Sequence, residues 1–185
     1  MIRTRVGYAG GKRDKPTYRV LGDHTEAIQI EYDAKRIGFE DLLEVFWDGH
    51  NPFGSKRSTQ YKAVLWTHGE DQARVAKAFV ARKIGKSTRK RTTEIAVAPR
   101  FWIAEDYHQK YYLRKRPTLM RSLLGEKPDD ATIRDSTLAA RANGWLAGHG
   151  TKKEIASEVE AMKLDDEAKK ALERALGNRA PVLCD

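Results

Sequence analysis

The stretch that most constrains how this chain folds covers residues 4–27. It combines a strand-like segment, the turn Gly10–Gly11, a loop set by Pro16, and Glu26 just ahead of a second strand-like segment. Glycine allows tight turns and proline fixes the backbone, so this loop is expected to hold a special conformation. Because loops between regular elements often carry chemistry, we expect half of an active site here, with Glu26 buried.

The apolar pattern up to residue 117 predicts an α+β fold. Strands are expected over residues 2–8, 27–32, 61–67 and 92–97. Apolar residues three and four apart predict a helix over residues 39–47, and a second helix is expected after a capping box of Thr67 with Glu70. Strands and helices that alternate through irregular connections predict a two-layer sandwich, in which helices pack on a mixed sheet.

From Pro117 onward the pattern is helical throughout. It predicts a first domain over residues 1–117 and an all-helical C-terminal extension over residues 118–185. Gly144 and Gly148 stand four residues apart and are expected to permit close packing of helices. The expected helix caps are Asp129 or Asp130, the capping box of Thr151 with Glu154, and Asp165.

The net charge of +9 is concentrated in the first domain, because residues 1–117 carry +10 and residues 118–185 carry −1. Six of the ten residues 82–91 are basic. One interpretation is a contact with a polyanion. The other is a solvated helix end whose cations complement the helix dipole. We favour the second, because no nucleic-acid motif or aromatic platform accompanies the cluster.

Several protein classes are excluded by the sequence. No run of eighteen apolar residues is present, and the first residues lack the apolar core of a secretion signal, so a cytoplasmic protein is expected. The single cysteine, Cys184, cannot form an intrachain disulfide or a multi-cysteine zinc site. Neither a GxGxxG motif nor a P-loop occurs, so a nucleotide-binding fold is not indicated.

Short motifs spread in order over residues 2–117 carry a family resemblance. Together they resemble the A-type peptide methionine sulfoxide reductases, which are specific for the S epimer of the sulfoxide. The motifs are Gly7–Tyr8–Ala9–Gly10–Gly11, Pro16–Thr17–Tyr18–Arg19, His24–Thr25–Glu26–Ala27, Leu43–Glu44–Val45–Phe46–Trp47, Ser58–Thr59–Gln60–Tyr61, Thr92–Thr93–Glu94–Ile95, and Ala104–Glu105–Asp106–Tyr107–His108–Gln109–Lys110–Tyr111.

The resemblance implies thiol-dependent reduction of methionine sulfoxide, in proteins or as the free amino acid, which repairs oxidative damage. In the family a cysteine thiolate attacks the sulfur, methionine leaves, and thiols reduce the resulting sulfenic acid. The resemblance implies no bound cofactor and no metal. The implied partners are oxidised proteins or free methionine sulfoxide and an external reductant, thioredoxin or dithiothreitol. Neither a membrane nor a nucleic acid is an expected partner.

Four residues match positions in the family's site. Glu26 matches the acid that serves the sulfoxide oxygen, and a carboxyl group beside aromatic rings is desolvated, which favours its protonated form. Tyr18 and Tyr61 match two phenols that bind that oxygen and wall the pocket for the substrate's methyl group. His108 matches a position near the pocket by a weaker correspondence. Outside this motif context, a lone tyrosine or glutamate is more often an ordinary core or surface residue.

The family's Gly-Cys-Phe-Trp-Gly motif, which carries the nucleophile, does not occur in the sequence. We expect that the chain lacks this segment through a misplaced start or a truncation, and that it reduces sulfoxides poorly. The alternative is a non-catalytic family member that acts as a binding or scaffold module with a basic surface. Lys56 and Arg57 also replace a usual acidic residue, and the loop between Tyr18 and Glu26 is short.

Cys184 is the only thiol, and two interpretations of it stay open. It serves as a resolving cysteine on a C-terminal tail, or it is inert. As the attacking nucleophile it is a poor candidate, because no helix N-terminus or basic partner is expected beside it to favour the thiolate. A separate alternative concerns the helices after Pro117, which could join chains together rather than cap the first domain.

Overall fold

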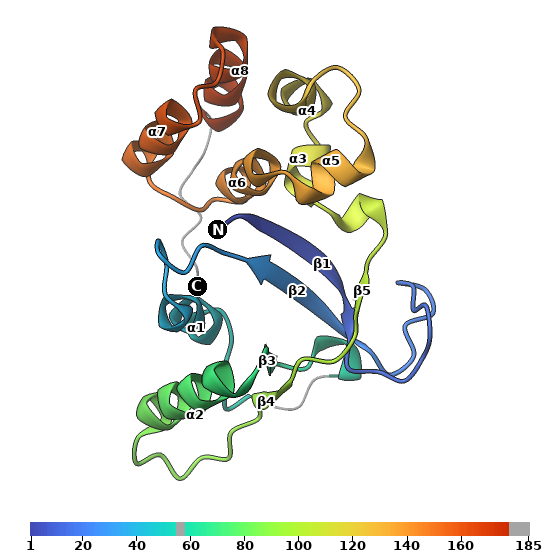
Figure 1. Ribbon diagram of the computed structural model, residues 1–185, viewed down its shortest axis with the longest axis vertical. Coiled ribbons are helices and arrows are strands. Elements are labelled where there is room, and N and C mark those ends of the chain that lie inside the picture. The colour runs from blue at the N-terminus through green and yellow to red at the C-terminus, as the bar shows by residue number, and fades with distance from the viewer. Residues whose placement is uncertain (55–57, 178–185) are drawn as a thin grey trace. The chain divides into compact units, whose positions relative to one another are not determined.

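The computed structural model describes residues 1–54 and 58–177 (Figure 1). The chain divides into two compact units. Val6–Ala104 forms the first, which we call the sheet unit, and Met1–Arg5 with Glu105–Asp185 forms the second, which we call the helical unit. The predicted α+β class is confirmed, since a sheet-containing part is followed by an all-helical part. The predicted domain boundary at residue 117 stays a prediction.

Two small sheets organise the strands. In the first, β1 (Arg3–Ala9) lies between β2 (Thr25–Glu31) and β5 (Phe101–Ile103). β1 and β5 are antiparallel, with Gly7 opposite Ile103. In the second sheet, β3 (Val64–Thr67) and β4 (Glu94–Val97) pair in parallel. β2 is therefore an edge strand, and it carries the predicted acid at its start.

Two helices build the core of the sheet unit. α1 (Phe39–Asp48) buries Leu43, and α2 (Glu70–Ile84) buries Ala76, Phe79 and Val80 in the same cluster. Trp47 of α1 meets the Phe79 ring edge-on, with the ring centres 6.2 Å apart. The apolar face predicted for residues 39–47 is confirmed. Its packing against α2, which also contacts β3 and β4, holds the second sheet in place.

The start of α2 differs from the prediction. Thr67 does not cap the helix, because it ends β3, is only 1% exposed, and donates its hydroxyl to the carbonyl oxygen of Ala96 at 3.3 Å. Gly69 takes the cap position with φ +93°, where glycine carries no steric penalty. The capping box of Thr67 with Glu70 is therefore wrong, because a contact with the neighbouring strand uses the threonine hydroxyl.

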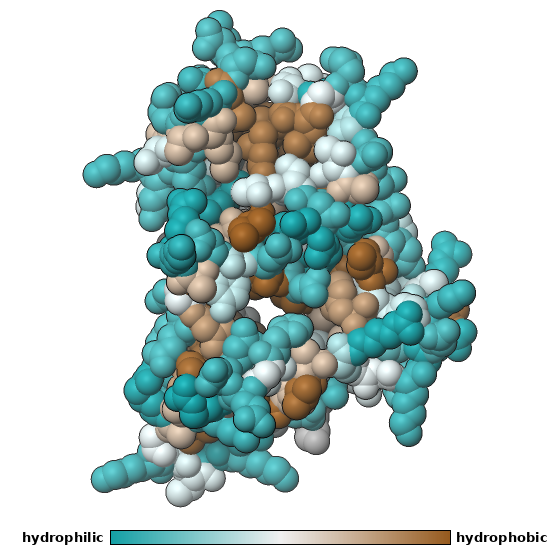
Figure 2. Space-filling model, in the orientation of Figure 1, coloured by the Kyte–Doolittle hydropathy of each residue, from teal (hydrophilic) through white to brown (hydrophobic). Residues whose placement is uncertain are grey.

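The helical unit packs around one apolar cluster that includes Leu113, Leu119, Trp145 and Leu172. Apolar side chains gather between α4 and α8, which pack on each other (Figure 2). Its elements are η2 (Asp106–His108), α3 (Tyr111–Arg114), α4 (Pro117–Leu124), α5 (Asp130–Asp135), α6 (Thr137–Leu146), α7 (Lys152–Ala161) and α8 (Asp166–Leu176).

Helix caps in this unit follow the sequence closely. Asp129 accepts a hydrogen bond from the amide of Thr132 at 2.6 Å, Thr151 and Glu154 form the predicted capping box, and Asp165 caps α8. The expected role of Gly144 is wrong, because a Cβ placed there would meet no atom within 4 Å. No close helix approach therefore depends on this glycine.

Most of the basic residues 82–91 have partners within the chain. Arg82 pairs with Glu40 at 3.2 Å, and Lys83 pairs with Glu44, both on α1. Arg89 lies over the ring of Phe53, and Arg91 donates to the carbonyl oxygen of Thr93. These contacts favour the interpretation of a helix end tied to its surroundings. Among the residues that the structure describes, no helix is long and apolar enough to cross a membrane.

Candidate functional site

The loop that follows β1 is held by the buried ring of His24. Its Nδ1 accepts a hydrogen bond from the amide of Gly11 at 3.2 Å. Its Nε2 lies 2.8 Å from the carbonyl oxygen of Arg13, which can only accept, so Nε2 carries the proton. A Cβ on Gly11 would lie 2.5 Å from the His24 ring, so this approach requires glycine. The imidazole therefore fixes both ends of the loop that carries Tyr18.

Tyr18 lies at the tip of this loop, between two paired residues. Thr17 and Val20 form an isolated antiparallel bridge, in which the Val20 amide donates to the Thr17 carbonyl oxygen at 3.0 Å. The turn that results presents the Tyr18 side chain, which is 45% exposed. A phenol in this position is rigid in its backbone and accessible to a ligand.

Glu26 lies near the start of β2, and its side chain is exposed. The expectation of a buried carboxyl is therefore wrong. The neighbouring residue Thr25 is buried instead, because side chains alternate between the two faces of a strand. The Glu26 carboxylate accepts a 2.7 Å hydrogen bond from the amide Nε2 of Gln60. Its position is set by this contact and by the strand.

Tyr61 ends the short 3₁₀ turn η1 (Thr59–Tyr61), where a strand was expected. Thr25 ties this turn to β2, because its hydroxyl donates to the carbonyl oxygen of Thr59 at 2.8 Å. Desolvation raises the pKa of Tyr61, and the charge of Glu26 and a hydrogen bond with Tyr18 act in the same direction. The Tyr61 hydroxyl is therefore a neutral donor at physiological pH, although half of the residue is exposed.

These contacts bring three of the predicted site residues together in the sheet unit. Tyr18, Glu26 and Tyr61 come from three separate segments, yet Tyr61 interacts electrostatically with both of the others. Sequence reasoning missed Gln60 and Thr25, which connect η1 to β2. The signal available for Gln60 was its place directly before a matched tyrosine, which does not reveal a partner 34 residues away.

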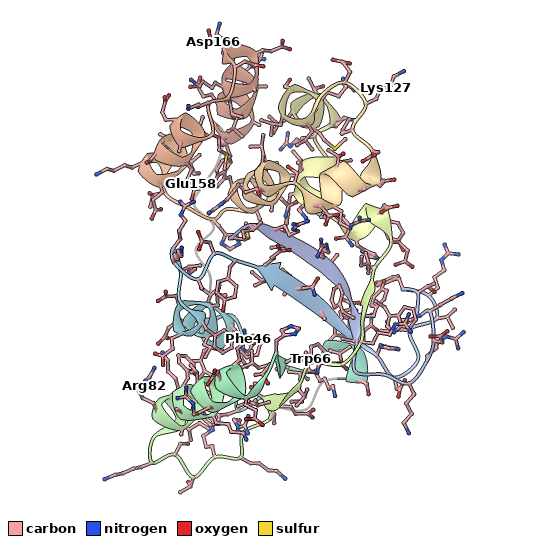
Figure 3. All side chains as sticks on the ribbon, in the orientation of Figure 1. Phe46, Trp66, Arg82, Lys127, Glu158 and Asp166 are labelled. Carbon is pink, nitrogen blue, oxygen red and sulfur yellow. The ribbon has the colours of Figure 1, made fainter. Side chains whose placement is uncertain are left out.

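Glu26 also lines a groove of about 310 Å³ in the sheet unit. The groove is mostly apolar, and Phe46 of α1 and Trp66 of β3 form part of its wall (Figure 3). Ile28 of β2 lines it and is 59% exposed. A larger cavity of about 630 Å³ lies in the helical unit between α7 and α8. It is lined by none of the matched site residues, whereas the smaller groove is lined by Glu26 but not by Tyr18 or Tyr61.

The remaining predicted residues lie elsewhere. His108 ends η2 in the helical unit, with its ring centre 4.2 Å from that of Tyr107, and its place near the site stays a prediction. Cys184, Lys56 and Arg57 lie outside the described residues. Within residues 1–54 and 58–177, no group of three or more potential ligands could hold a metal ion.

Comparison with known proteins decides the family. The family model described as "Peptide methionine sulfoxide reductase" matches residues 1–138. The chain belongs to the peptide methionine sulfoxide reductase family. A peptide methionine sulfoxide reductase of Drosophila melanogaster is 41% identical over 171 residues, which are 89% of this chain and 66% of that protein. Peptide methionine sulfoxide reductase A5 of Oryza sativa subsp. japonica is 38% identical over 169 residues, 86% of this chain and 66% of that protein.

A solved structure supports the same family and fold. The crystal structure of Mxr1 from Saccharomyces cerevisiae in reduced form has a TM-score of 0.55 and 29% sequence identity, covering 62% of this chain and 71% of that chain. The chain spans 66% of the length of the Drosophila and rice reductases. It therefore corresponds to part of these family members, and the site above is described for that part.

Proposed function

We propose that this chain carries the sulfoxide-binding and acid groups of a methionine (S)-sulfoxide reductase. The supporting observation is the grouping of Tyr18, Glu26 and Tyr61, with the Tyr61 pKa raised in part by the other two. Two phenol donors and one carboxyl group suit a sulfoxide oxygen, which is a strong acceptor and has no proton of its own. Family membership selects this chemistry among the reactions that such a group could serve.

The proposed reaction divides the work between the site and thiols. The phenols bind the sulfoxide oxygen, and Glu26 gives it a proton while a thiolate attacks the sulfur. The oxygen passes to the attacking thiol as a sulfenic acid, and the sulfide leaves. Two further thiols, from dithiothreitol or a thioredoxin-like protein, then form a disulfide and release water. The described residues include no cysteine, so they do not supply the attacking thiol.

Binding of a sulfoxide tests this proposal without turnover. The S epimer of N-acetyl-methionine sulfoxide should shift NMR resonances of residues near Tyr18 and Tyr61. Glu26→Ala and Tyr61→Phe each remove one donor to the sulfoxide oxygen and should each weaken that binding about five- to tenfold. The matched controls Glu126→Ala and Tyr111→Phe change exposed residues of the helical unit and should leave binding unchanged. Equal affinities across all five proteins would refute the proposal.

A dithiothreitol assay with the same substrate tests the source of the thiol. The 185-residue chain should turn over slowly or not at all, because Cys184 is its only cysteine. Robust turnover that disappears in Cys184→Ser would instead make Cys184 the attacking residue. Binding and turnover therefore separate the oxygen-binding groups from the nucleophile.

A further inference from the structure

Glu26 is exposed, yet a general acid must point in one direction to be useful. A free glutamate side chain populates several rotamers, and ordering it has an entropic cost. In this chain, burial does not provide the order that the sequence predicted. The contact that can provide it is the 2.7 Å hydrogen bond from Gln60 Nε2 to Glu26 Oε1.

Gln60 is well placed to hold another side chain, because its own backbone is fixed. It lies in the middle of η1, a turn closed by the Tyr61 amide, which donates to the Ser58 carbonyl oxygen at 3.0 Å. The hydroxyl of the buried Thr25, the residue before Glu26, holds the Thr59 carbonyl oxygen of the same turn at 2.8 Å. Two adjacent residues of β2 are thus joined to two adjacent residues of η1.

In this contact the amide nitrogen of Gln60 is the donor and a carboxyl oxygen of Glu26 is the acceptor. The Nε2 group of glutamine is a donor at every ordinary pH, so it always occupies an acceptor oxygen. Oε1 of Glu26 can accept this bond whether the carboxyl group is charged or neutral. When the group carries a proton, that proton therefore belongs on Oε2. Gln60 in this way determines which carboxyl oxygen can serve a ligand.

We propose that Gln60 is a positioning residue that orients the Glu26 carboxyl group so that Oε2 faces the sulfoxide oxygen. The inference rests on the proposed function above and extends it to epimer choice. The sulfoxide sulfur is a stereocentre, and the other two contacts to its oxygen come from Tyr18 and Tyr61. An acid held in one orientation favours one epimer, whereas an acid free to rotate must be ordered for either epimer and loses that preference.

The test measures binding of both epimers of N-acetyl-methionine sulfoxide to the 185-residue chain. Gln60→Glu keeps the shape and replaces the donor with an acceptor, and Gln60→Ala removes the group. Each should lower the affinity for the S epimer about tenfold and change the affinity for the R epimer less than about twofold. Thr59→Ala alters the exposed neighbour in the same turn, keeps its backbone carbonyl, and should change neither affinity.

The ratio of the S-epimer affinity to the R-epimer affinity distinguishes a misoriented acid from a misfolded site, because a misfolded site would lose affinity for both epimers together. A second readout is the side-chain amide signal of Gln60, which should shift in Glu26→Ala, where its acceptor is removed. An unchanged epimer ratio in both Gln60 variants would overturn this inference alone. Failure of the wild type to bind either epimer would overturn the proposed function and this inference together.

Discussion

The ammonium group of Lys110 donates a hydrogen bond to the carbonyl oxygen of Thr4 at 2.7 Å. It donates a second, also at 2.7 Å, to the carbonyl oxygen of Arg134. Lys110 has φ +54° and is 5% exposed, so an unusual backbone conformation directs a buried cation at two carbonyl oxygens. Within the helical unit, this lysine joins the first residues of the chain to α5.

The buried lysine should make stability depend on alkaline pH. Desolvation lowers the pKa of Lys110 from 10.5 to about 8, although the carboxylate of Asp135 opposes this shift. Between about pH 8 and pH 10.5 the unfolded chain therefore binds more protons than the folded chain, and the Lys110 contribution to the free energy of unfolding rises with pH. The rise amounts to at most about 3 kcal/mol, since one pKa unit corresponds to about 1.4 kcal/mol.

Urea denaturation at pH 7.5 and pH 10 measures this dependence, with Lys110→Met as the reference. The variant keeps a long apolar stem and removes the titrating group, so subtracting its pH profile cancels the other residues that titrate in this range. At neutral pH it should also lose about 1–3 kcal/mol, because two carbonyl oxygens lose their donor. Parallel profiles for the two proteins would show that Lys110 keeps an ordinary protonation equilibrium.

The Tyr61 hydroxyl should report on its two neighbours. The Glu26 charge and the Tyr18 hydrogen bond both contribute to the raised pKa of Tyr61. Glu26→Gln and Tyr18→Phe should therefore each bring the Tyr61 pKa down toward 10.0, and the double variant should bring it lower than either. The ring carbon signal of Tyr61, followed by NMR from pH 8 to 12, measures this. If the Tyr61 pKa were the same in all three variants as in the wild type, Tyr18 and Glu26 would not interact with Tyr61, and the three residues would not form one site.

The sequence predicted well those contacts whose two partners lie close together in the chain. The box of Thr151 and Glu154 formed because both partners belong to one turn and nothing else competes for them. The box of Thr67 and Glu70 failed because a strand neighbour, Ala96, takes the threonine hydroxyl. The same rule covers helix faces, since the face of α1 follows from local spacing alone.

The site needed distant contacts, and these the sequence did not reveal. Motif resemblance selected Tyr18, Glu26 and Tyr61, which the structure brings together. It gave no indication that Glu26 would be exposed or that Gln60 would hold it, because both depend on how η1 lies against β2. The preference of each residue for helix, strand or turn carries no information about how two distant segments lie against each other.

Substitution of Gly11, with Gly144 of α6 as the comparison, tests how closely the loop after β1 packs on His24. Gly11→Ala would place a methyl group 2.6 Å from the backbone nitrogen of His24, which cannot move freely, so we expect a loss of about 2 kcal/mol in the free energy of unfolding. Gly144→Ala, inside α6 with no atom within 4 Å, should instead add about 0.5–1 kcal/mol. Chemical denaturation measures both. Equal effects of the two substitutions would show that His24 does not confine Gly11.

The hydroxyl of Thr25 should be required to hold η1 against β2. Thr25→Val keeps the shape of this buried side chain and removes its hydrogen bond to the Thr59 carbonyl oxygen, so we expect a loss of about 1–2 kcal/mol. Because η1 carries Gln60 and Tyr61, the variant should also bind the S sulfoxide less tightly. Thr25→Ser keeps the hydroxyl, removes only a methyl group, and should retain the binding. Denaturation and NMR titration measure the two effects, and equal sulfoxide affinity in the valine and serine variants would show that η1 holds its place without Thr25.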